Sequence, residues 1–501
     1  MKIYNYRNIV TYWCQLAVVI YSFIGYSQVK AGTLEKPNVL FIAVDDLRPE
    51  LGCYGKSNIH SPNIDRLANS GIVFTNAYAN YPVCGASRAS LLSGVYPSES
   101  RFLKWNCSQD DDIPGIVSLP MHFRNNNYET VSLGKVYNNF DDGKGSWVKN
   151  WRPPVSTTDW DYQSKASIQI FEERNAERFK NNRLRNNDNL PQRGPAYERA
   201  DVPDIAYDDG RIAMKAIEQL QEFQNSSDPF FLAVGFHKPH LPFNAPEKYW
   251  AIYDKDDIKL PSNYDLPQNA PESAKFNWPE LRAYYDIPSD GPLPDSTALN
   301  LIHGYYACIS YVDAQIGKVL NALEEYGLAQ NTIVVLWGDH GWFLGEHGFW
   351  SKHSNLRIGA HAPLIVKVPW MQAGFKIDNL VEFVDIYPTL CKLAGLSLPI
   401  HLQGESLVPM IENPESVEKR PIFFRNGNGE TIIAGPYAYT EWIDYDTGKV
   451  KENMLFNHQS DPQENINIAE QAEYKELILN LHNQLYEHLK LRDRINIAPK
   501  R

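Results

Sequence analysis

Short apolar runs that each end in polar residues recur along this chain, and they constrain its fold more than any other feature. The first, NVLFIAV from Asn38 to Val44, is apolar almost throughout, as in a strand buried on both faces of a parallel sheet. Similar runs occur at Thr130–Gly134, Phe230–Phe236, Thr332–Gly338 and Pro363–Val368. Apolar residues at helical spacing lie between them, at Ser61–Ser70, Asp209–Phe223 and Ile302–Leu323. Strands that alternate with helices predict an α/β fold with a mainly parallel sheet sandwiched by helices.

The length of 501 residues favours two domains of unequal size. After Gln403 the pattern changes to short strand-like pieces, PIFFRN, TIIAG and YAYTEW, and then to a helix-like stretch from Ala469 to Leu491. We therefore predict a large N-terminal domain over residues 28–400 and a smaller C-terminal α+β domain with a short antiparallel sheet over residues 401–501.

The N-terminus has the pattern of a secretory signal peptide over residues 1–27. Lys2 and Arg7 precede an apolar stretch from Ile9 to Gly25, and small residues end it before Gln28. The rival interpretation is a retained membrane anchor, but the stretch is interrupted by polar residues and is short beside the ~20 apolar residues that a span needs. We therefore expect an exported protein, periplasmic or secreted, with no membrane attachment after cleavage.

Charge and cysteine content exclude some classes of function. The formal net charge of −12 argues against nucleic-acid and anionic-membrane partners, although a local basic pocket can still bind an anion. Five cysteines remain beyond the signal peptide, an odd set without metal-ligand spacing, so a disulfide scaffold is not indicated. In an oxidising compartment, an unpaired cysteine is a liability unless it has a function or is chemically changed.

Two long segments lack a regular pattern. Asp141–Asp204 is polar, and Ala251–Leu299 is rich in Pro and Asp. Long irregular segments in compact domains are commonly functional, so these two either shape a substrate cleft or are solvated decoration.

Polar pairs follow the apolar runs at the points where strands would end. They are Asp45-Asp46, Gly134-Lys135, His237-Lys238 and Asp339-His340. In open α/β sheets ligands bind beyond the carboxyl ends of the strands, so we expect these segments to converge at one edge. Any single aspartate could be a helix cap or a turn residue. As a group, Asp45, Asp46, Asp339 and His340 are suited to a hard divalent cation such as Ca²⁺.

The segment CGASRASLLSG places Cys84 just before a predicted helix, where backbone N–H groups favour an anion, and Arg88 adds a fixed positive charge. A small buried cysteine beside a solvated arginine would give the same loose pattern. The surrounding motifs decide between the two interpretations.

Taken together, these motifs resemble the type I sulfatases of the alkaline-phosphatase superfamily, and most of all their iduronate-2-sulfatase branch. The resemblance spans roughly residues 37–469. It rests on the segments PNVLFIAVDDLRPELGCYG, SPNIDRLANSGIVFTNAY, CGASRASLLSG, LGKVY, GFHKPHLPF, GDHGWFLGEHGFWSKHSN, HAPLIVKVP and SDPQENINIA, which occur in the family's order.

The resemblance implies a mechanism with a modified cysteine. Cys84 would be oxidised to formylglycine by a formylglycine-generating maturation enzyme. One Ca²⁺ would be held by Asp45, Asp46, Asp339, His340 and the modified Cys84. Other residues would position the modified side chain or neutralise the sulfate: Arg88, Lys135, His237 and Lys352. We expect His237 to be the general acid, with Lys352 as its competitor.

Further pocket residues are open on sequence grounds. Lys238 could hold a substrate carboxylate or be solvated, and His240 could face the cleft or orient the backbone. His353 is a possible pocket member. Ala86 stands where the family's modification motif, Cys-x-Pro-x-Arg, has proline, and Asn138 stands where the branch usually has histidine.

The expected substrate is a sulfated polysaccharide, with uronic-acid-containing chains favoured, or oligosaccharides derived from it. Two alternatives stay open. One is a phosphate or phosphonate ester hydrolase of the same superfamily. The other is a non-catalytic relic that only binds sulfated glycans because Ala86 prevents maturation.

Overall fold

The computed structural model describes residues 36–154, 161–180, 192–414 and 418–495. From Asn38 onward the chain forms one compact unit. An eight-stranded sheet lies at its centre, with the order β10-β2-β9-β8-β1-β6-β3-β4. In that order the strands are Phe375–Glu382, Ile72–Tyr78, Leu364–Lys367, Thr332–Gly338, Asn38–Val44, Phe230–Phe236, Glu129–Gly134 and Lys149–Trp151. Every pairing is parallel except those of β9, so the predicted mainly parallel sheet is confirmed.

All five apolar runs form strands of this sheet, but three of its strands were not predicted from the sequence. β2 carries Thr75 and Asn76 in its middle, β10 mixes buried and exposed positions, and β4 has only three residues. Their sequences are less continuously apolar than those of the central strands, because these three strands lie at or next to the edges of the sheet. β9 is a predicted strand that runs antiparallel to β8 and β2, and an apolar run carries no information about direction.

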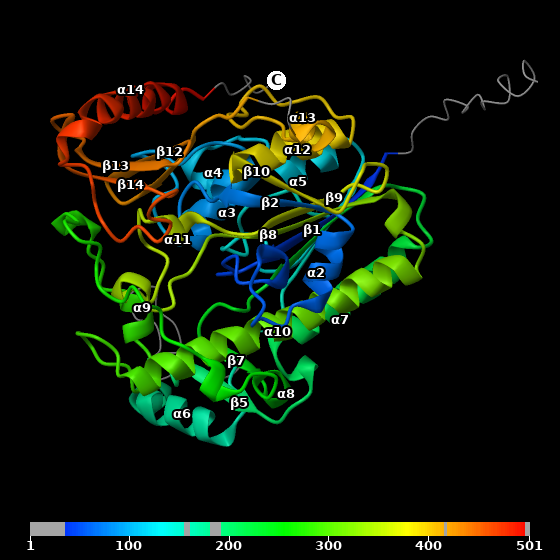
Figure 1. Ribbon diagram of the computed structural model, residues 1–501. Coiled ribbons are helices and arrows are strands. Elements are labelled where there is room, and N and C mark those ends of the chain that lie inside the picture. Colours follow the sequence, from blue (N-terminus) through cyan, green and yellow to red (C-terminus); the bar gives the residue numbers. More distant parts are fainter. Residues whose placement is uncertain (1–35, 155–160, 181–191, 415–417, 496–501) are drawn as a thin grey trace, which may run out of the picture. The chain divides into compact units, whose positions relative to one another are not determined.

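Helices cover both faces of the sheet (Figure 1). Leu40, Ile42 and Val44 of β1 face a core that includes α2, α7 and α10, whereas Val39 and Phe41 face a core that includes α3, α5 and α12. These helices span Pro62–Asn69, Asp208–Phe223, Asp295–Glu325, Cys84–Ser93, Leu119–Asn125 and Ile386–Leu393. The alternation follows from the two-residue period of a strand. The three helices predicted between the apolar runs are confirmed as α2, α7 and α10, and the helix predicted after Cys84 is α3.

A separate four-stranded antiparallel sheet forms near the C-terminus, as predicted. Its strands β11 to β14 are Ile422–Asn426, Gly429–Ala434, Tyr437–Asp444 and Lys449–Asn457. Helix α14 (Lys475–Arg492) lies along this sheet (Figure 1). Its Leu481 and Leu485 share a buried core with Ile432 of β12 and Leu455 of β14. β14 was not predicted, because its first half is charged. A domain boundary at residue 400 stays a proposal.

The two irregular segments differ in structure. The first contains β4, helix α6 (Lys165–Lys180) and strand β5 (Tyr197–Ala200), which pairs with β7 (Phe243–Pro246). The second contains short turns and α9 (Pro279–Arg282) before α10 begins. The remaining short helices are α4 (Gln109–Asp112), α8 (Glu247–Trp250), α11 (Arg357–Ala360) and α13 (Val408–Glu412).

No helix among the described residues is long and apolar enough to cross a membrane. The predicted signal peptide, residues 1–27, lies outside the described residues.

Candidate active site

Residues that follow two neighbouring strands form the centre of the candidate site. β1 and β8 pair in parallel and end at the same level, so Asp45–Asp46 and Asp339–His340 leave the sheet side by side. All four side chains are fully buried. The Asp46 amide donates to the Asp339 carboxylate at 2.9 Å, and oxygens of the three aspartates lie within 4.8 Å of one another. Three carboxylates beside an imidazole fit a hard divalent cation such as Ca²⁺.

Cys84 points into this cluster from the first position of α3. Its sulfur lies 3.2 Å from His340 Nε2 and 3.8 Å from an Asp46 oxygen. Burial raises the pKa of the Cys84 thiol well above its usual value, and the charge of Asp45 adds to the rise. The thiol is therefore protonated at neutral pH, and a protonated thiol is a poor nucleophile.

The residue after Cys84 has to be small. A Cβ atom on Gly85 would lie 2.0 Å from the carbonyl oxygen of Trp105, so only glycine allows the Trp105 loop to approach the start of α3. Trp105 itself is 58% exposed, and its carbonyl accepts a hydrogen bond from Asn138. The loop, the start of α3 and the residues after β3 are thus held together.

Arg88 bridges the residues that follow β1 and β8. Its side chain is fully buried and pairs with Asp45 at 2.9 Å and with Asp339 at 3.0 Å. It also donates to the backbone carbonyls of Lys135 and Val136. Burial opposes ionisation of Asp45, but Lys135 and Arg88 hold its pKa well below its usual range.

Two lysines from separate segments contact the aspartates. Lys135, directly after β3, donates to Asp45 at 2.5 Å. Lys352, from the loop after β8, lies 3.2 Å from both oxygens of Asp46 and 4.8 Å from the centre of the Trp342 ring. Burial lowers the pKa of Lys352, but the negative charges around it, Asp46 first and then others that include Glu280 and Asp45, together raise the pKa well above its usual value. Lys352 therefore keeps its proton.

His237 follows β6 and is positioned through its backbone. Its amide and that of Lys238 donate to the Asp209 carboxylate at 2.7 and 2.8 Å. Burial lowers the pKa of His237 well below its usual value, and Lys135 lowers it further. Burial raises the pKa of Asp209 to about 7.

The three predicted substrate-binding residues lie in different surroundings. His240 lines the cavity next to the cluster, with Nε2 3.9 Å from Asp46. The ammonium group of Lys238 is directed inward and donates to the carbonyls of His240 and Pro242. His353 bonds Ser351 and stacks on Phe276, with burial lowering its pKa to about 4.

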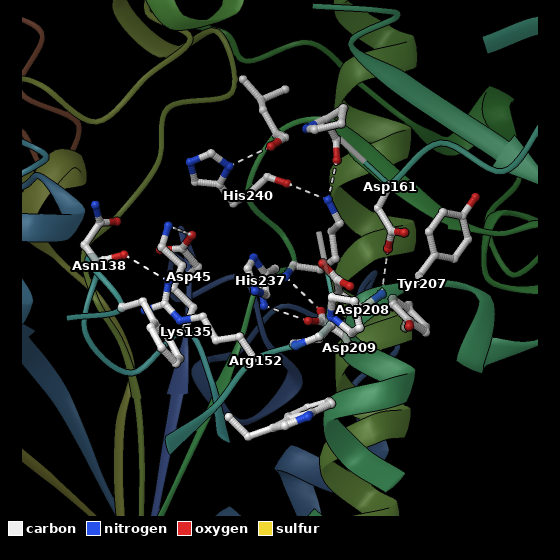
Figure 2. Close-up of a pocket in the computed structure, with 18 of the residues that line it drawn as sticks. Asp45, Lys135, Asn138, Arg152, Asp161, Tyr207, Asp208, Asp209, His237 and His240 are labelled. Carbon is white, nitrogen blue, oxygen red and sulfur yellow. Dashed lines mark hydrogen bonds and ion pairs between the residues drawn. The ribbon is translucent and has the colours of Figure 1, made fainter. Parts of the chain in front are cut away.

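A cavity of about 740 Å³ opens beside Asp45 (Figure 2). In the close-up, Lys135, His237 and His240 border it on one side, and Asp161 and Asp208 lie across from them. Its lining also includes Asn138, Phe140, Asn150, Arg152, Tyr207 and Asp209. A cavity of this volume has the size of a small-molecule site.

Sequence reasoning did not identify four carboxylates of this site, which are Asp161, Asp208, Asp209 and Glu280. Asp209 was predicted only as the start of a helix. Glu280, on α9, contacts Lys352 and His240. For Glu280 the one available signal was the polar and proline-rich character of Ala251–Leu299, which indicated a segment that could shape a cleft without identifying any residue in it.

Comparisons with known proteins decide the family. The model of the sulfatase family matches residues 37–396, and a model described as N-sulphoglucosamine sulphohydrolase, C-terminal, matches residues 345–491. Iduronate 2-sulfatase of Mus musculus is 31% identical, over 89% of this chain and 93% of that protein. The chain belongs to the sulfatase family.

This sulfatase is therefore a sulfuric ester hydrolase, and its resemblance to the iduronate-2-sulfatase branch is confirmed. Its fold is shared by BT4656, solved in complex with its substrate D-glucosamine-2-N,6-O-disulfate (TM-score 0.71, 23% identity, 91% of this chain and 98% of that one). The fold is also that of a phosphonate monoester hydrolase from Silicibacter pomeroyi (TM-score 0.70, 20% identity, 92% and 96%).

Proposed function

We propose that this sulfatase hydrolyses sulfate esters on a sulfated, uronic-acid-containing polysaccharide or its oligosaccharides, through formylglycine at Cys84 and one Ca²⁺. The observation that carries the proposal is the position of Cys84. Its side chain lies among Asp46, His340 and the other aspartates at the start of a helix, beside a cavity whose lining includes Lys135, Arg152 and His237.

The metal would be held by Asp45, Asp46, Asp339 and His340, together with the side chain at position 84. These residues fit Ca²⁺ because carboxylate oxygens predominate and all of them are buried. When bound, the ion would supply positive charge where a sulfate ester gains negative charge in the transition state. Arg88 and Lys135 already pair with Asp45, so the acid cluster is partly compensated before any metal binds.

Modification of Cys84 would supply a better nucleophile than the buried thiol. The native thiol is buried and its pKa is raised, so it is a weak nucleophile where a nucleophile is needed. Formylglycine, as its hydrate, would supply a hydroxyl nucleophile and a second hydroxyl for release of sulfate. We propose a formylglycine-generating enzyme as a partner that accepts Ala86 in the motif, and export to the periplasm or the medium as the setting.

The sulfate would be neutralised by side chains that converge from separate segments. Lys135 follows β3, Lys352 lies in the loop after β8, and both ammonium groups are directed at the aspartates. Such donors, fixed in advance in a buried site, stabilise developing charge without reorganising during the reaction.

His237 is our general acid for the sugar oxygen that leaves. It borders the cavity (Figure 2), whereas Lys352 is 2% exposed and holds its proton tightly. A lysine that keeps its proton stabilises charge better than it donates a proton. The lowered pKa of His237 means that the imidazole is protonated only toward acid pH or once a sulfate anion lies beside it.

Phe140 supports a glycan rather than a small anion as the substrate. It lines the cavity and is 46% exposed, and the Arg152 guanidinium lies 5.5 Å from the centre of its ring. Exposed aromatic rings offer an apolar face to sugars.

The decisive test is sulfate release from a panel of sulfated uronic-acid-containing oligosaccharides, with protein co-expressed with a formylglycine-generating enzyme. We expect release that a chelator abolishes and Ca²⁺ restores, with phosphate and phosphonate monoesters cleaved far more slowly. Faster cleavage of the phosphorus esters would favour the alternative hydrolase. Failure on every glycan, with formylglycine and bound Ca²⁺ both verified, would contradict the proposal.

Replacing His237 by glutamine should lower turnover of sugar sulfates by ~10²–10⁴-fold and leave an aryl sulfate with an acidic phenol nearly unaffected. The reason is that an acidic phenol leaves without protonation, whereas a sugar alcohol does not. Because a lowered pKa makes the charged imidazole an acid-pH form, kcat/KM for sugar sulfates should rise as the pH falls.

Steady-state kinetics across pH, with a sugar sulfate and an aryl sulfate as substrates, measure this difference in the loss of turnover. Lys352→Gln is the matched comparison and should slow both substrates alike, since it removes charge rather than a proton. An equal loss on both substrates for His237→Gln would transfer the acid role away from His237.

A further inference from the structure

The irregular segment Ala251–Leu299 brings a carboxylate into the candidate active site. Glu280, on α9, contacts two basic side chains at once: its oxygens lie 2.8 Å from Lys352 Nζ and 3.2 Å from His240 Nε2. Lys352 in turn contacts Asp46, and a ring nitrogen of His240 lies within 4.8 Å of the Cys84 sulfur. Glu280 is therefore only one residue removed from the reacting centre.

Glu280 is held rigidly in that position. Arg193, from the other irregular segment, donates to the Glu280 carbonyl at 2.9 Å and lies 3.8 Å from its carboxylate. The Arg193 guanidinium itself packs over Tyr284 at 4.7 Å. The Glu280 side chain is 15% exposed. Burial opposes its ionisation, but Lys352 and His240 hold its pKa well below its usual value, so Glu280 is a fixed negative charge.

A negative charge at this position is unexpected for a site that has to attract an anion. Glu280 does not contact Asp45, Asp46 or Asp339 in any hydrogen bond or ion pair between described residues. Its partners are instead the ammonium group of Lys352 and the imidazole of His240, which border the site. It offsets part of the positive charge that an incoming ester meets, and the penalty it imposes grows with the charge of that ester.

We propose that Glu280 is a specificity-determining residue that matches the site to singly charged esters and disfavours doubly charged ones. A sulfate monoester carries one negative charge, whereas a phosphate monoester carries close to two at neutral pH. The inference rests on the proposed function of the same site. It adds a residue that discriminates sulfate monoesters from phosphate monoesters. Glu280 acts through its charge at short range in a buried site, where salt screens little.

Calorimetric titration with two inert anions, inorganic sulfate as the dianion and methanesulfonate as the monoanion, tests this directly. Both present sulfonyl oxygens, and neither has to be turned over. The full-length Ca²⁺-loaded protein and its Glu280→Gln variant are compared, and the metal-free forms are measured in parallel. Removing one nearby charge should tighten binding by roughly tenfold per unit of ligand charge.

The affinity ratio of sulfate to methanesulfonate should therefore rise about tenfold in Glu280→Gln. Glu280→Asp, which keeps the charge, should keep the wild-type ratio. Glu222→Gln is the matched control, because it removes an exposed carboxylate that pairs with Lys149 and does not line the cavity. A purely structural role for Glu280 would change both affinities by the same factor, and that outcome, or an unchanged ratio, overturns the proposal.

Hydrolysis provides an independent measurement. The rate on a phosphate monoester relative to the sulfate ester should also rise about tenfold in Glu280→Gln. If no variant releases sulfate but the anion ratio shifts, the proposed function fails and the role of Glu280 stands. If sulfate is released and neither ratio shifts, Glu280 is not the selector.

Discussion

Alanine at position 84 should lower sulfate release by roughly 10⁴-fold or more while the protein stays folded. The reason lies in the surroundings of Cys84. Its sulfur contacts His340 and Asp46 in a buried cluster. In our proposal the modified side chain at position 84 is the nucleophile of the reaction. Losing a covalent nucleophile removes the step that divides one difficult reaction into two easier ones. Lys135, Lys352 and any bound metal would still bind the sulfate, so substrate binding should weaken far less than turnover.

The measurement combines single-turnover sulfate release with the mass of the peptide that contains Cys84. Wild-type protein should show the aldehyde form of Cys84, and activity should scale with the modified fraction across preparations. Cys53→Ala is a suitable control, because Cys53 carries a half-buried thiol and lies outside the site. Its backbone carbonyl accepts a hydrogen bond from Lys376, which the substitution keeps. Substantial release by Cys84→Ala would refute a nucleophile at this position. Wild-type protein that stays unmodified and inactive would instead favour a glycan-binding relic.

The central part of the site could be predicted because it depends on one rule of sheet geometry. Parallel neighbours end at the same edge, so strands recognised from apolar runs bring together whatever follows them. β3, β6, β1 and β8 are consecutive neighbours, and this places Lys135, His237, Asp45 and Asp339 at one edge. The proximity of these residues is observed, whereas their catalytic roles stay predictions.

Other parts could not be predicted, because they depend on contacts that leave no periodic trace in the sequence. β9 runs antiparallel because of how the chain returns from the loop after β8, and its apolar residues would look the same in either direction. Glu280 sits in a segment without helical or strand spacing, and its position is fixed by Arg193 and Lys352, which are distant in sequence. Lys238 illustrates the reverse case, since its motif suggests an exposed cation but its ammonium group bonds two carbonyls inside the turn.

Replacing Arg88 by methionine should destabilise the metal-free protein by about 3–5 kcal/mol, the largest stability effect we expect from one substitution in the site. Arg88 is fully buried and pairs with two carboxylates, Asp45 and Asp339, while donating to two backbone carbonyls. Methionine fills a similar volume but takes the guanidinium away from Asp339 and both carbonyls, and leaves Asp45 with Lys135 alone. Arg88→Lys should lose less, because it keeps the charge but not the fork that reaches both aspartates.

Denaturant titrations with and without Ca²⁺ separate the contribution of the ion pairs of Arg88 from that of its packing. If the aspartates bind Ca²⁺, the ion will pair with the carboxylates that Arg88 no longer neutralises, so Ca²⁺ should recover part of the loss in Arg88→Met. Arg66→Met is the control, because Arg66 pairs with Glu324 on the surface and should cost no more than about 1 kcal/mol. An Arg88→Met protein that unfolds at the wild-type denaturant concentration would show that the carboxylates are not held by Arg88. A loss that Ca²⁺ leaves unchanged would instead place the effect in packing against Trp337, whose ring lies 5.7 Å from the guanidinium.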